Sequence, residues 1–181
     1  MPGVLFGGGS FRPIFSCGVM DALLDQEIMF PYCIGVSAGA ADAAFYISRQ
    51  RERNIRIFTK YRNDKRYFGG RNLLRERNPF GIQFVFRDMN NDIDPFDLEA
   101  FRQYQGDFVI TVTDAQTGQV HYLHKEDVDR AYMVFQASCS LPVIFPPAEI
   151  GGREYFDGGL RGAGEEGQDC PDTPGARTEQ L

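Results

Sequence analysis

Apolar runs and polar turns alternate in a regular order at the start of the chain. The run GVLF (residues 3–6) predicts a short strand, and GGGSFRP after it predicts a loop, because glycines and a proline disfavour a regular element. Between residues 14 and 26, apolar residues recur at steps of three and four. This spacing predicts an amphipathic helix with Pro13 near its first turn. The order is therefore strand, glycine loop, helix.

A second strand and helix follow. MFPYCIGV (29–36) predicts a strand, and SAGAADAAFYISRQ (37–50) predicts an alanine-rich helix with a buried apolar stripe. Further along, DIDPFDLEAFRQY (92–104) predicts another helix, with Asp94 as its N-cap and Pro95 at its first helical position.

Later segments alternate in type. DFVITVTDAQTGQVHYLH (107–124) alternates apolar and polar residues around a Thr-Gly turn, which predicts a β-hairpin. DVDRAYMVFQASC (127–139) returns to helical spacing, and residues 143–160 predict two short strands around Gly151-Gly152. Helices interleaved with strands predict an α/β fold with a mainly parallel sheet.

Composition separates this predicted domain, residues 1–160, from a polar end. Residues 161–181 contain no aromatic residue and are rich in Gly, Pro and acids, which predicts a disordered tail. The chain has 181 residues, 43% of them apolar, enough for one globular domain. Because no apolar run approaches a membrane span and the N-terminus lacks the features of a secretion signal, we expect a cytoplasmic protein. The spacing of the cysteines predicts buried thiols rather than a metal site or disulfides: Cys17, Cys33, Cys139 and Cys170.

Charge is strongly segregated along the chain. Residues 49–77 hold eleven Lys or Arg against three acids, a net +8, while the remainder holds 8 basic and 22 acidic residues, a net -14. Aromatic residues are interleaved with these positive charges, so anionic lipid headgroups or nucleic acid could dock on this segment. The alternative is a solvated helix followed by a basic loop.

One short motif indicates chemistry. GVSAG, Gly35 to Gly39, fits G-x-S-x-G and lies between a predicted strand and a predicted helix, the setting of a nucleophilic serine. Glycines two residues either side leave room for Ser37 on a sharp turn, and the helix N-terminus favours negative charge on its oxygen. Tight strand-to-helix turns also favour Gly, Ser and Ala in general. The motif alone leaves Ser37 open between nucleophile and turn residue.

A nucleophilic serine needs a base. In α/β-hydrolases the chain order is serine, acid, histidine, but His121 and His124 precede the last promising acid of this chain. Being three residues apart on the predicted hairpin, they lie on opposite faces, and we interpret them as surface or packing residues. Asp157 in YFDGGL is the better candidate, although Asp-Gly-Gly is also an ordinary turn signal.

Four stretches taken together resemble the patatin-like phospholipase family and span residues 3–160. They are GGSFRP for the family's G-G-G-x-R-G, then GVSAG, ASCSLPVIFPP and DGG at 157–159, in the family's order. The resemblance implies a three-layer α/β/α sandwich and a Ser-Asp dyad without histidine, metal or cofactor. The implied roles are Ser37 as nucleophile, Asp157 as base, the backbone of Gly8, Gly9 and Ser10 as oxyanion hole, Arg12 beside that hole, and Gly35, Gly39 and Gly158 as supporting residues.

The implied function is hydrolysis of lipid acyl esters, with phospholipids or lysophospholipids as substrates. The basic segment would then contact an anionic membrane, and nucleic acid is not an expected partner. Two residues depart from the family pattern, since Ser10 replaces the third glycine of the loop and Pro13 replaces its last. Family members also continue past the DGG turn, so the resemblance implies a catalytic domain that is incomplete on its C-terminal side.

Two other functions are alternatives to hydrolysis. The altered loop and the polar end favour a catalytically inactive lipid- or membrane-binding scaffold. Nucleotide binding by the glycine loop is disfavoured: counted from Gly7 the sixth position is Arg12, counted from Gly8 the third is Ser10, and no G-K-[ST] follows.

Overall fold

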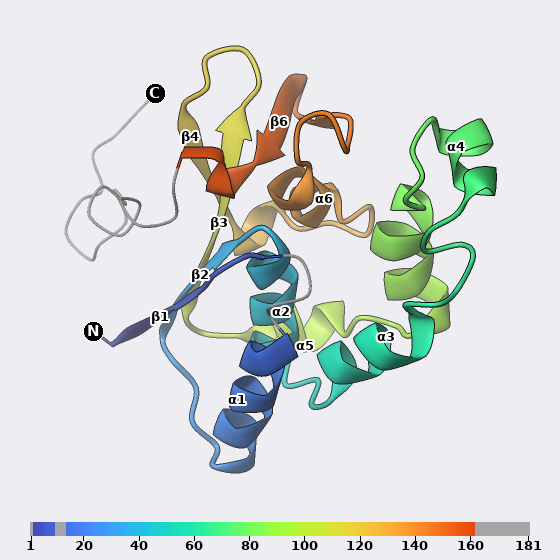
Figure 1. The fold of residues 1–181 in the computed structure, drawn as a ribbon. Helices are drawn as coiled ribbons and strands as arrows, with labels where there is room; N and C mark the ends of the chain where they lie inside the picture. Colours follow the sequence, from blue (N-terminus) through green and yellow to red (C-terminus); the bar gives the residue numbers. More distant parts are fainter. Residues whose placement is uncertain (1, 10–13, 162–181) are drawn as a thin grey trace.

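A computed structural model describes residues 2–9 and 14–161 and contains a six-stranded sheet (Figure 1). Its central strand is β3 (Asp107–Asp114), which is buried from its second residue to its last. β2 (Tyr32–Val36) pairs parallel to β3, and β1 (Gly3–Phe6) pairs parallel to β2. The two inner parallel strands, β2 and β3, are buried and largely apolar, as is typical of an α/β sheet, whereas β1 at the edge is partly exposed.

The remaining strands extend the sheet as hairpins. β4 (Val120–His124) and β6 (Arg153–Asp157) both pair antiparallel to β3, and β5 (Ala148–Ile150) pairs antiparallel to β6. Short turns join the two hairpins, and short turns require antiparallel neighbours. The prediction of an α/β fold with a mainly parallel central sheet and flanking helices is confirmed. The second helical layer of the implied three-layer sandwich does not lie within the described residues, whose helices cover one face of the sheet.

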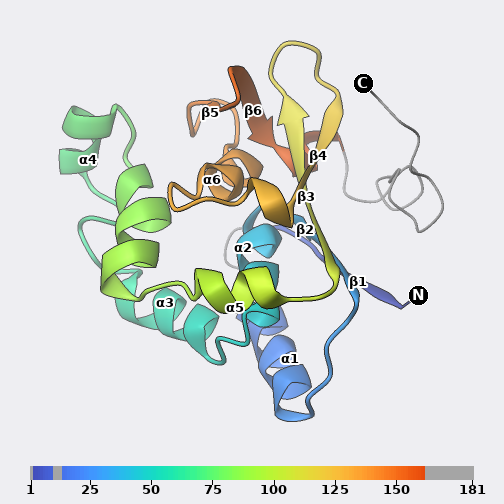
Figure 2. The same cartoon turned by 180° about the vertical axis from the view of Figure 1, so that it is seen from behind.

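Helices of the described part of the chain gather on one face of the sheet, as the two opposite views show (Figures 1 and 2). α1 (Ile14–Asp25), α2 (Ala38–Ile47), α5 (Leu98–Gln103) and α6 (Met133–Cys139) contribute buried side chains to a core shared with the sheet. α2 is the innermost of them, since Gly39 to Ile47 are buried apart from Ala41.

A second group of helices lies farther from the sheet (Figure 2). It consists of α3 (Arg53–Tyr61), α4 (Gly70–Glu76) and the π-helix η1 (Gln83–Ile93), with a small core of its own. The basic segment 49–77 therefore lies largely in α3 and α4. Short 3₁₀ turns complete the fold: η2 (Lys125–Asp127) and η3 (Gly158–Arg161). Over the described ranges, no helix has the length and apolar character needed to cross a bilayer.

One predicted helix start is wrong. The helix expected from Asp94 begins at Leu98, and its N-cap is Asp97, whose Oδ1 accepts the N–H of Ala100 at 2.9 Å. Asp94 instead follows the π-helix and forms an ion pair with Arg56 at 2.6 Å. Because the Asp94 carboxylate is bound to the guanidinium of Arg56, it is held away from the N-terminus of α5 and does not cap this helix.

A second helix is shorter than predicted. The spacing over 127–139 predicts one helix, but α6 begins only at Met133, because Tyr132 has a φ of 55°. Asp129 holds the preceding turn, since its Oδ1 accepts the N–H of Ala131 at 2.8 Å. The predicted tail lies, from residue 162 on, outside the described residues.

Candidate active site

Ser37 lies on the turn between β2 and α2 in a strained conformation. Its φ is 55° and its ψ is -134°, a combination that residues with a side chain rarely adopt. A Cβ on Gly35 would overlap the backbone of Ala40, and a Cβ on Gly39 would overlap the carbonyl group of Phe6. The two glycines of G-x-S-x-G are therefore required for steric reasons, because a side chain at either position would prevent the turn from fitting between strand and helix.

The sheet brings Asp157 to this turn from a distant part of the sequence. Val36, the residue before Ser37, pairs with Thr111 of β3, and Asp157 pairs with the next residue, Val112. Because β4 pairs with both Thr111 and Val112 along one edge of β3, β2 and β6 lie end to end along its other edge, and Ser37 meets Asp157 where these two strands adjoin. The Ser37 hydroxyl donates a hydrogen bond of 2.7 Å to Oδ2 of Asp157.

Asp157 is held in a buried environment, with 2% of its surface exposed. Its second oxygen, Oδ1, accepts the N–H of Gly159 at 2.8 Å. Burial raises the pKa of Asp157 above its usual range, and the hydrogen bonds from Ser37 and Gly159 oppose that rise. A carboxylate with a raised pKa at hydrogen-bond distance from a hydroxyl can accept its proton.

A serine of the ASCSLPVIFPP stretch fixes the backbone of the turn at Ser37. The Oγ of Ser138 accepts the N–H of Ser37 at 2.9 Å and donates to the carbonyl oxygen of Thr111 at 2.9 Å. The backbone of Asp157 is also fixed by this stretch, because its N–H donates to the backbone carbonyl oxygen of Ser140 at 2.9 Å. Ser138 had not been predicted as a site residue. The matching stretch was its only signal, since a buried serine in a helix has no pattern of its own.

The glycine loop after β1 lies against Ser37. A Cβ on Gly8 would come within 2.5 Å of the Ser37 Cβ and 3.1 Å of its Oγ. Gly9 has a φ of 140°, which favours glycine. The structure therefore places Gly8 beside Ser37. Ser10 and Arg12, the other two residues predicted around the oxyanion, lie outside the described residues.

Gly158 also has a steric role, since a Cβ there would overlap the backbone of Thr111. Both histidines lie on β4, as the hairpin prediction requires. The ring of His121 packs against Tyr155 with centroids 5.8 Å apart, and the N–H of His124 donates to Oδ2 of Asp127 at 2.7 Å. These contacts agree with their interpretation as packing and surface residues.

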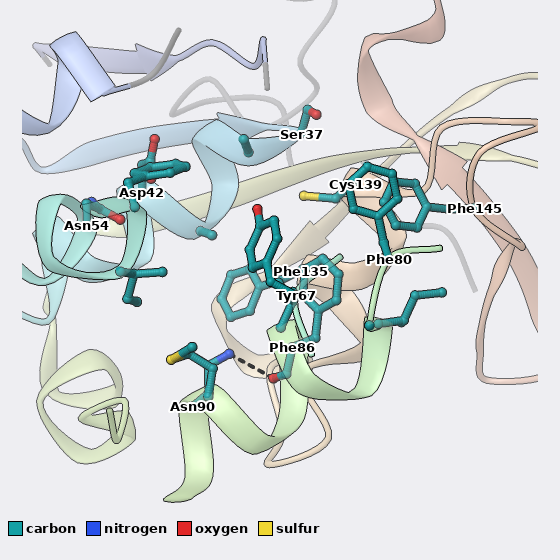
Figure 3. Close-up of a pocket in the computed structure, with 18 of the residues that line it drawn as sticks. Ser37, Asp42, Asn54, Tyr67, Phe80, Phe86, Asn90, Phe135, Cys139 and Phe145 are labelled. Atoms are coloured by element: carbon teal, nitrogen blue, oxygen red, sulfur yellow. Dashed lines mark hydrogen bonds between the residues drawn. The ribbon is translucent and has the colours of Figure 1, made fainter. Parts of the chain in front are cut away.

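An apolar cavity of about 270 Å³ opens beside Ser37 (Figure 3). One wall is a single face of α2, because Ala38, Ala41, Asp42 and Phe45 follow helical spacing. Opposite it stand side chains of η1 and of the segments before α4 and after α6. The further lining residues include Ile57, Phe58, Phe80, Ile82, Val85, Phe86, Met89, Phe135, Cys139, Leu141, Ile144 and Phe145. A pocket with these walls suits an apolar chain.

A buried arginine supports the far end of this pocket. Arg53 of α3 is fully buried, and its guanidinium stacks on the ring of Phe45 at 4.0 Å. Its Nη2 donates to Oδ1 of Asn90 at 3.0 Å, and its Nε lies 3.4 Å from Asp94. Burial lowers the pKa of Arg53 to about 10, so the side chain stays charged at neutral pH. The residue therefore ties α3 to η1.

Several basic residues of 49–77 are bound within the molecule. Arg51 pairs with Asp25 at 2.6 Å, Arg66 pairs with Asp64 at 2.8 Å, and Arg56 pairs with Asp94. Five others are exposed and form no ion pair within the described part of the chain: Arg62, Lys65, Arg71, Arg75 and Arg77. In the described ranges, no three His, Cys, Asp or Glu side chains converge as a metal site would require.

Comparison with known proteins relates this geometry to a family. The sequence model of patatin-like phospholipase matches residues 4–163 of the chain. The crystal structure of VipD from Legionella pneumophila is similar in fold, with a TM-score of 0.57 and 14% sequence identity over 87% of this chain and 46% of VipD. The chain thus spans about half the length of the solved structure that it matches. A comparison with curated proteins gives no match.

Proposed function

Because this chain belongs to the patatin-like phospholipase family, we propose that it is a serine hydrolase of lipid acyl esters, with Ser37 as nucleophile and Asp157 as general base. The observation that carries the proposal is the 2.7 Å hydrogen bond between these two side chains, on a strained turn that opens into an apolar pocket. Backbone strain at a buried polar pair next to a cavity is typical of catalytic sites.

The reaction follows from the two side chains. Asp157 accepts the hydroxyl proton while Ser37 Oγ attacks the ester carbonyl carbon, and the resulting oxyanion collapses as the alcohol leaves with the proton from Asp157. This step leaves the acyl group on Ser37. Water then attacks the acyl-enzyme, gives its proton to Asp157, and releases the fatty acid as the proton returns to Ser37.

We propose the glycine loop as the source of oxyanion donors. The N–H of Ser37 is bound to Ser138 and cannot point at an oxyanion. Gly8 lies against Ser37, so backbone N–H groups of the Gly8–Gly9 segment are the near candidates. Loss of one such donor typically lowers the rate by about 10² to 10³.

We propose that the cavity holds the acyl chain and that a membrane supplies the substrate. Large apolar side chains near the basic residues are exposed, Phe68 at 55%, Leu73 at 54% and Leu74 at 89%. Arg71, Leu74 and Arg75 lie three and four residues apart and therefore share one face of α4, which is an apolar and cationic surface. Such a surface suits the headgroup region of an anionic bilayer, in which arginines bind phosphate and leucines enter the acyl boundary.

We also keep the cytoplasm as the proposed compartment. The described cysteines, Cys17, Cys33 and Cys139, are free thiols, and free thiols are usual in reducing compartments.

A covalent probe tests the proposed chemistry. A fluorophosphonate should label the wild type, and Ser37→Ala should lose the label. Asp157→Asn should label at least about 10² times more slowly, because general-base help contributes that much. Circular dichroism of each variant is the control for folding. A folded wild type that stays unlabelled but binds lipid vesicles would instead support the inactive scaffold.

A further inference from the structure

Besides Ser37 and Asn90, three polar side chains interrupt the apolar lining of the pocket. They are Asp42 on α2, Asn54 on α3 and Tyr67 before α4, and all three line the cavity. The hydroxyl end of Tyr67 is directed toward α2 in Figure 3. We call these three residues the polar cluster of the pocket.

Within the described part of the chain, no side chain of the polar cluster forms a hydrogen bond to another residue. Asp42 is 3% exposed, and its Oδ2 is buried without a partner. Asn90, which also lines the pocket, is different: its amide donates to the carbonyl oxygen of Phe86 at 2.8 Å, and its oxygen accepts from Arg53. Leaving a buried polar group unpaired is costly, and native proteins rarely do so without a cause. The buried carboxyl of Asp42 is therefore available to a ligand, and Asn54 and Tyr67 line the same cavity.

Helix geometry places Asp42 at the middle of an acyl chain rather than at its ester. Asp42 follows Ser37 by five residues, which is about 7.5 Å along a helix axis at 1.5 Å per residue. It shares the pocket-facing side of α2 with Ala38, Ala41 and Phe45. A chain attached at Ser37 that runs along this face meets Asp42 before it reaches Phe45.

The polar cluster favours an uncharged ligand group that can both donate and accept hydrogen bonds. Burial raises the pKa of Asp42 to about 8, so its carboxyl group is mainly protonated at neutral pH. A protonated carboxyl, an amide and a phenol each donate and accept hydrogen bonds. A hydroxyl group is their complement. A methylene chain would leave all three unsatisfied.

We propose that Asp42, Asn54 and Tyr67 bind a hydroxyl group carried by the acyl chain, so that hydroxylated fatty acyl esters are preferred over unsubstituted ones. The inference rests on the proposed function in taking this pocket as the acyl site. It adds a determinant of substrate choice about one and a half helical turns beyond the reacting serine.

A position scan of esters tests the preference. The probes are p-nitrophenyl esters of one chain length, unsubstituted or with a hydroxyl at successive mid-chain carbons. We expect kcat/KM to be about tenfold or more higher for one hydroxyl position, because a polar site discriminates against a substrate that leaves it unpaired. Equal kcat/KM values for all esters would overturn the proposal.

Variants of Asp42 show whether the cluster is the cause. Asp42→Leu should abolish the ratio between hydroxylated and unsubstituted esters, whereas Asp42→Asn, which still donates and accepts, should keep most of it. Phe45→Leu is the matched control on the same face of α2 and should change both esters by the same factor. If Asp42→Leu also changed both esters by the same factor, the cluster would have no role in substrate choice.

Binding separates this inference from the proposed function. Calorimetry with a free hydroxylated fatty acid and its unsubstituted counterpart needs no turnover. If the wild type hydrolyses no ester, the proposed function fails, but tighter binding of the hydroxylated acid that Asp42→Leu removes would still support the polar cluster. Equal affinity for the two acids, or binding of neither, would overturn it.

Discussion

At the scale of single residues, the site consists of a few polar side chains in a largely buried environment. Ser37 and Asp157 lie far apart in the sequence. Strand pairing in the sheet, rather than local sequence, brings their side chains within hydrogen-bond distance. Asp157 was predictable as a candidate from its DGG motif and the family resemblance. Ser138 and Asp42 were not, since a single Ser or Asp in an alanine-rich or aromatic helix carries no pattern that distinguishes it.

The raised pKa of Asp157 predicts the acid limb of the pH profile. Its carboxyl must be ionised to accept the serine proton, and burial keeps it protonated to a higher pH than an ordinary aspartate, whose pKa is about 3.9. We expect kcat/KM to be constant above this raised pKa and to fall about tenfold per pH unit below it. The measurement is kcat/KM from pH 4 to 8, with circular dichroism to exclude acid unfolding. Full activity of folded protein at pH 4 would contradict the role of Asp157.

Ser138 should act on the nucleophile through its backbone. Ser138→Ala removes the acceptor of the Ser37 N–H, and an unpaired buried N–H costs about 1–3 kcal/mol. We expect a loss of stability in that range and a slower reaction of Ser37 with the fluorophosphonate. Ser140→Ala is the matched control, because the buried Ser140 hydroxyl donates to the carbonyl of Gln136 instead. Equal labelling rates in the two variants would argue against a positioning role for Ser138.

At the scale of elements, local pattern was sufficient where strand and helix meet at the nucleophile. The first strand, α1, β2, α2 and both hairpins lie where periodicity and turn residues predict them. Sequence patterns misplaced or missed the elements whose position depends on tertiary contacts. The ion pair of Asp94 moved a helix start, and the π-helix, whose Asp94 N–H returns to the carbonyl of Met89 at 3.0 Å, has no standard periodicity to reveal it.

The contact between β1 and α2 should tolerate no extra atom. Gly39→Ala places a Cβ on the carbonyl of Phe6, so strand and helix must separate. We expect a loss of several kcal/mol or failure to fold, in the range of overpacked cores. Gly18→Ala in the exposed part of α1 is the control, since nothing lies within 4 Å of its new Cβ, and helix propensity should stabilise it by about 0.5–1 kcal/mol. Urea denaturation measures both, and comparable stability of the two variants would refute the steric account.

At the scale of the whole molecule, two layers of helices enclose the pocket. The inner layer follows the turn at Ser37, and the outer group consists of α3, α4 and η1 (Figure 1). The outer group and its turns carry the exposed basic residues of 49–77 together with the exposed Phe68, Leu73 and Leu74. The charge segregation was visible in the sequence, but which cations remain exposed was not, because ion pairs such as Arg51 with Asp25 join distant segments.

Anionic membranes should bind through α4. Reversing two charges, Arg71→Glu with Arg75→Glu, should weaken binding to vesicles containing phosphatidylserine by tenfold or more, since each basic residue near the surface contributes about 1 kcal/mol. Binding should also weaken with added salt. Vesicle sedimentation measures the effect, with Arg102→Glu on α5 as a control on an exposed arginine outside the basic segment. Equal loss in the control would show a general charge effect rather than a docking surface.

The most direct test of the whole account is the covalent intermediate. Wild-type protein mixed with a p-nitrophenyl acyl ester and quenched in acid should gain the mass of one acyl group, located on Ser37 by peptide mass spectrometry, and Ser37→Ala should gain none. An acyl group found on another residue, or ester hydrolysis at the wild-type rate by folded Ser37→Ala, would contradict the account.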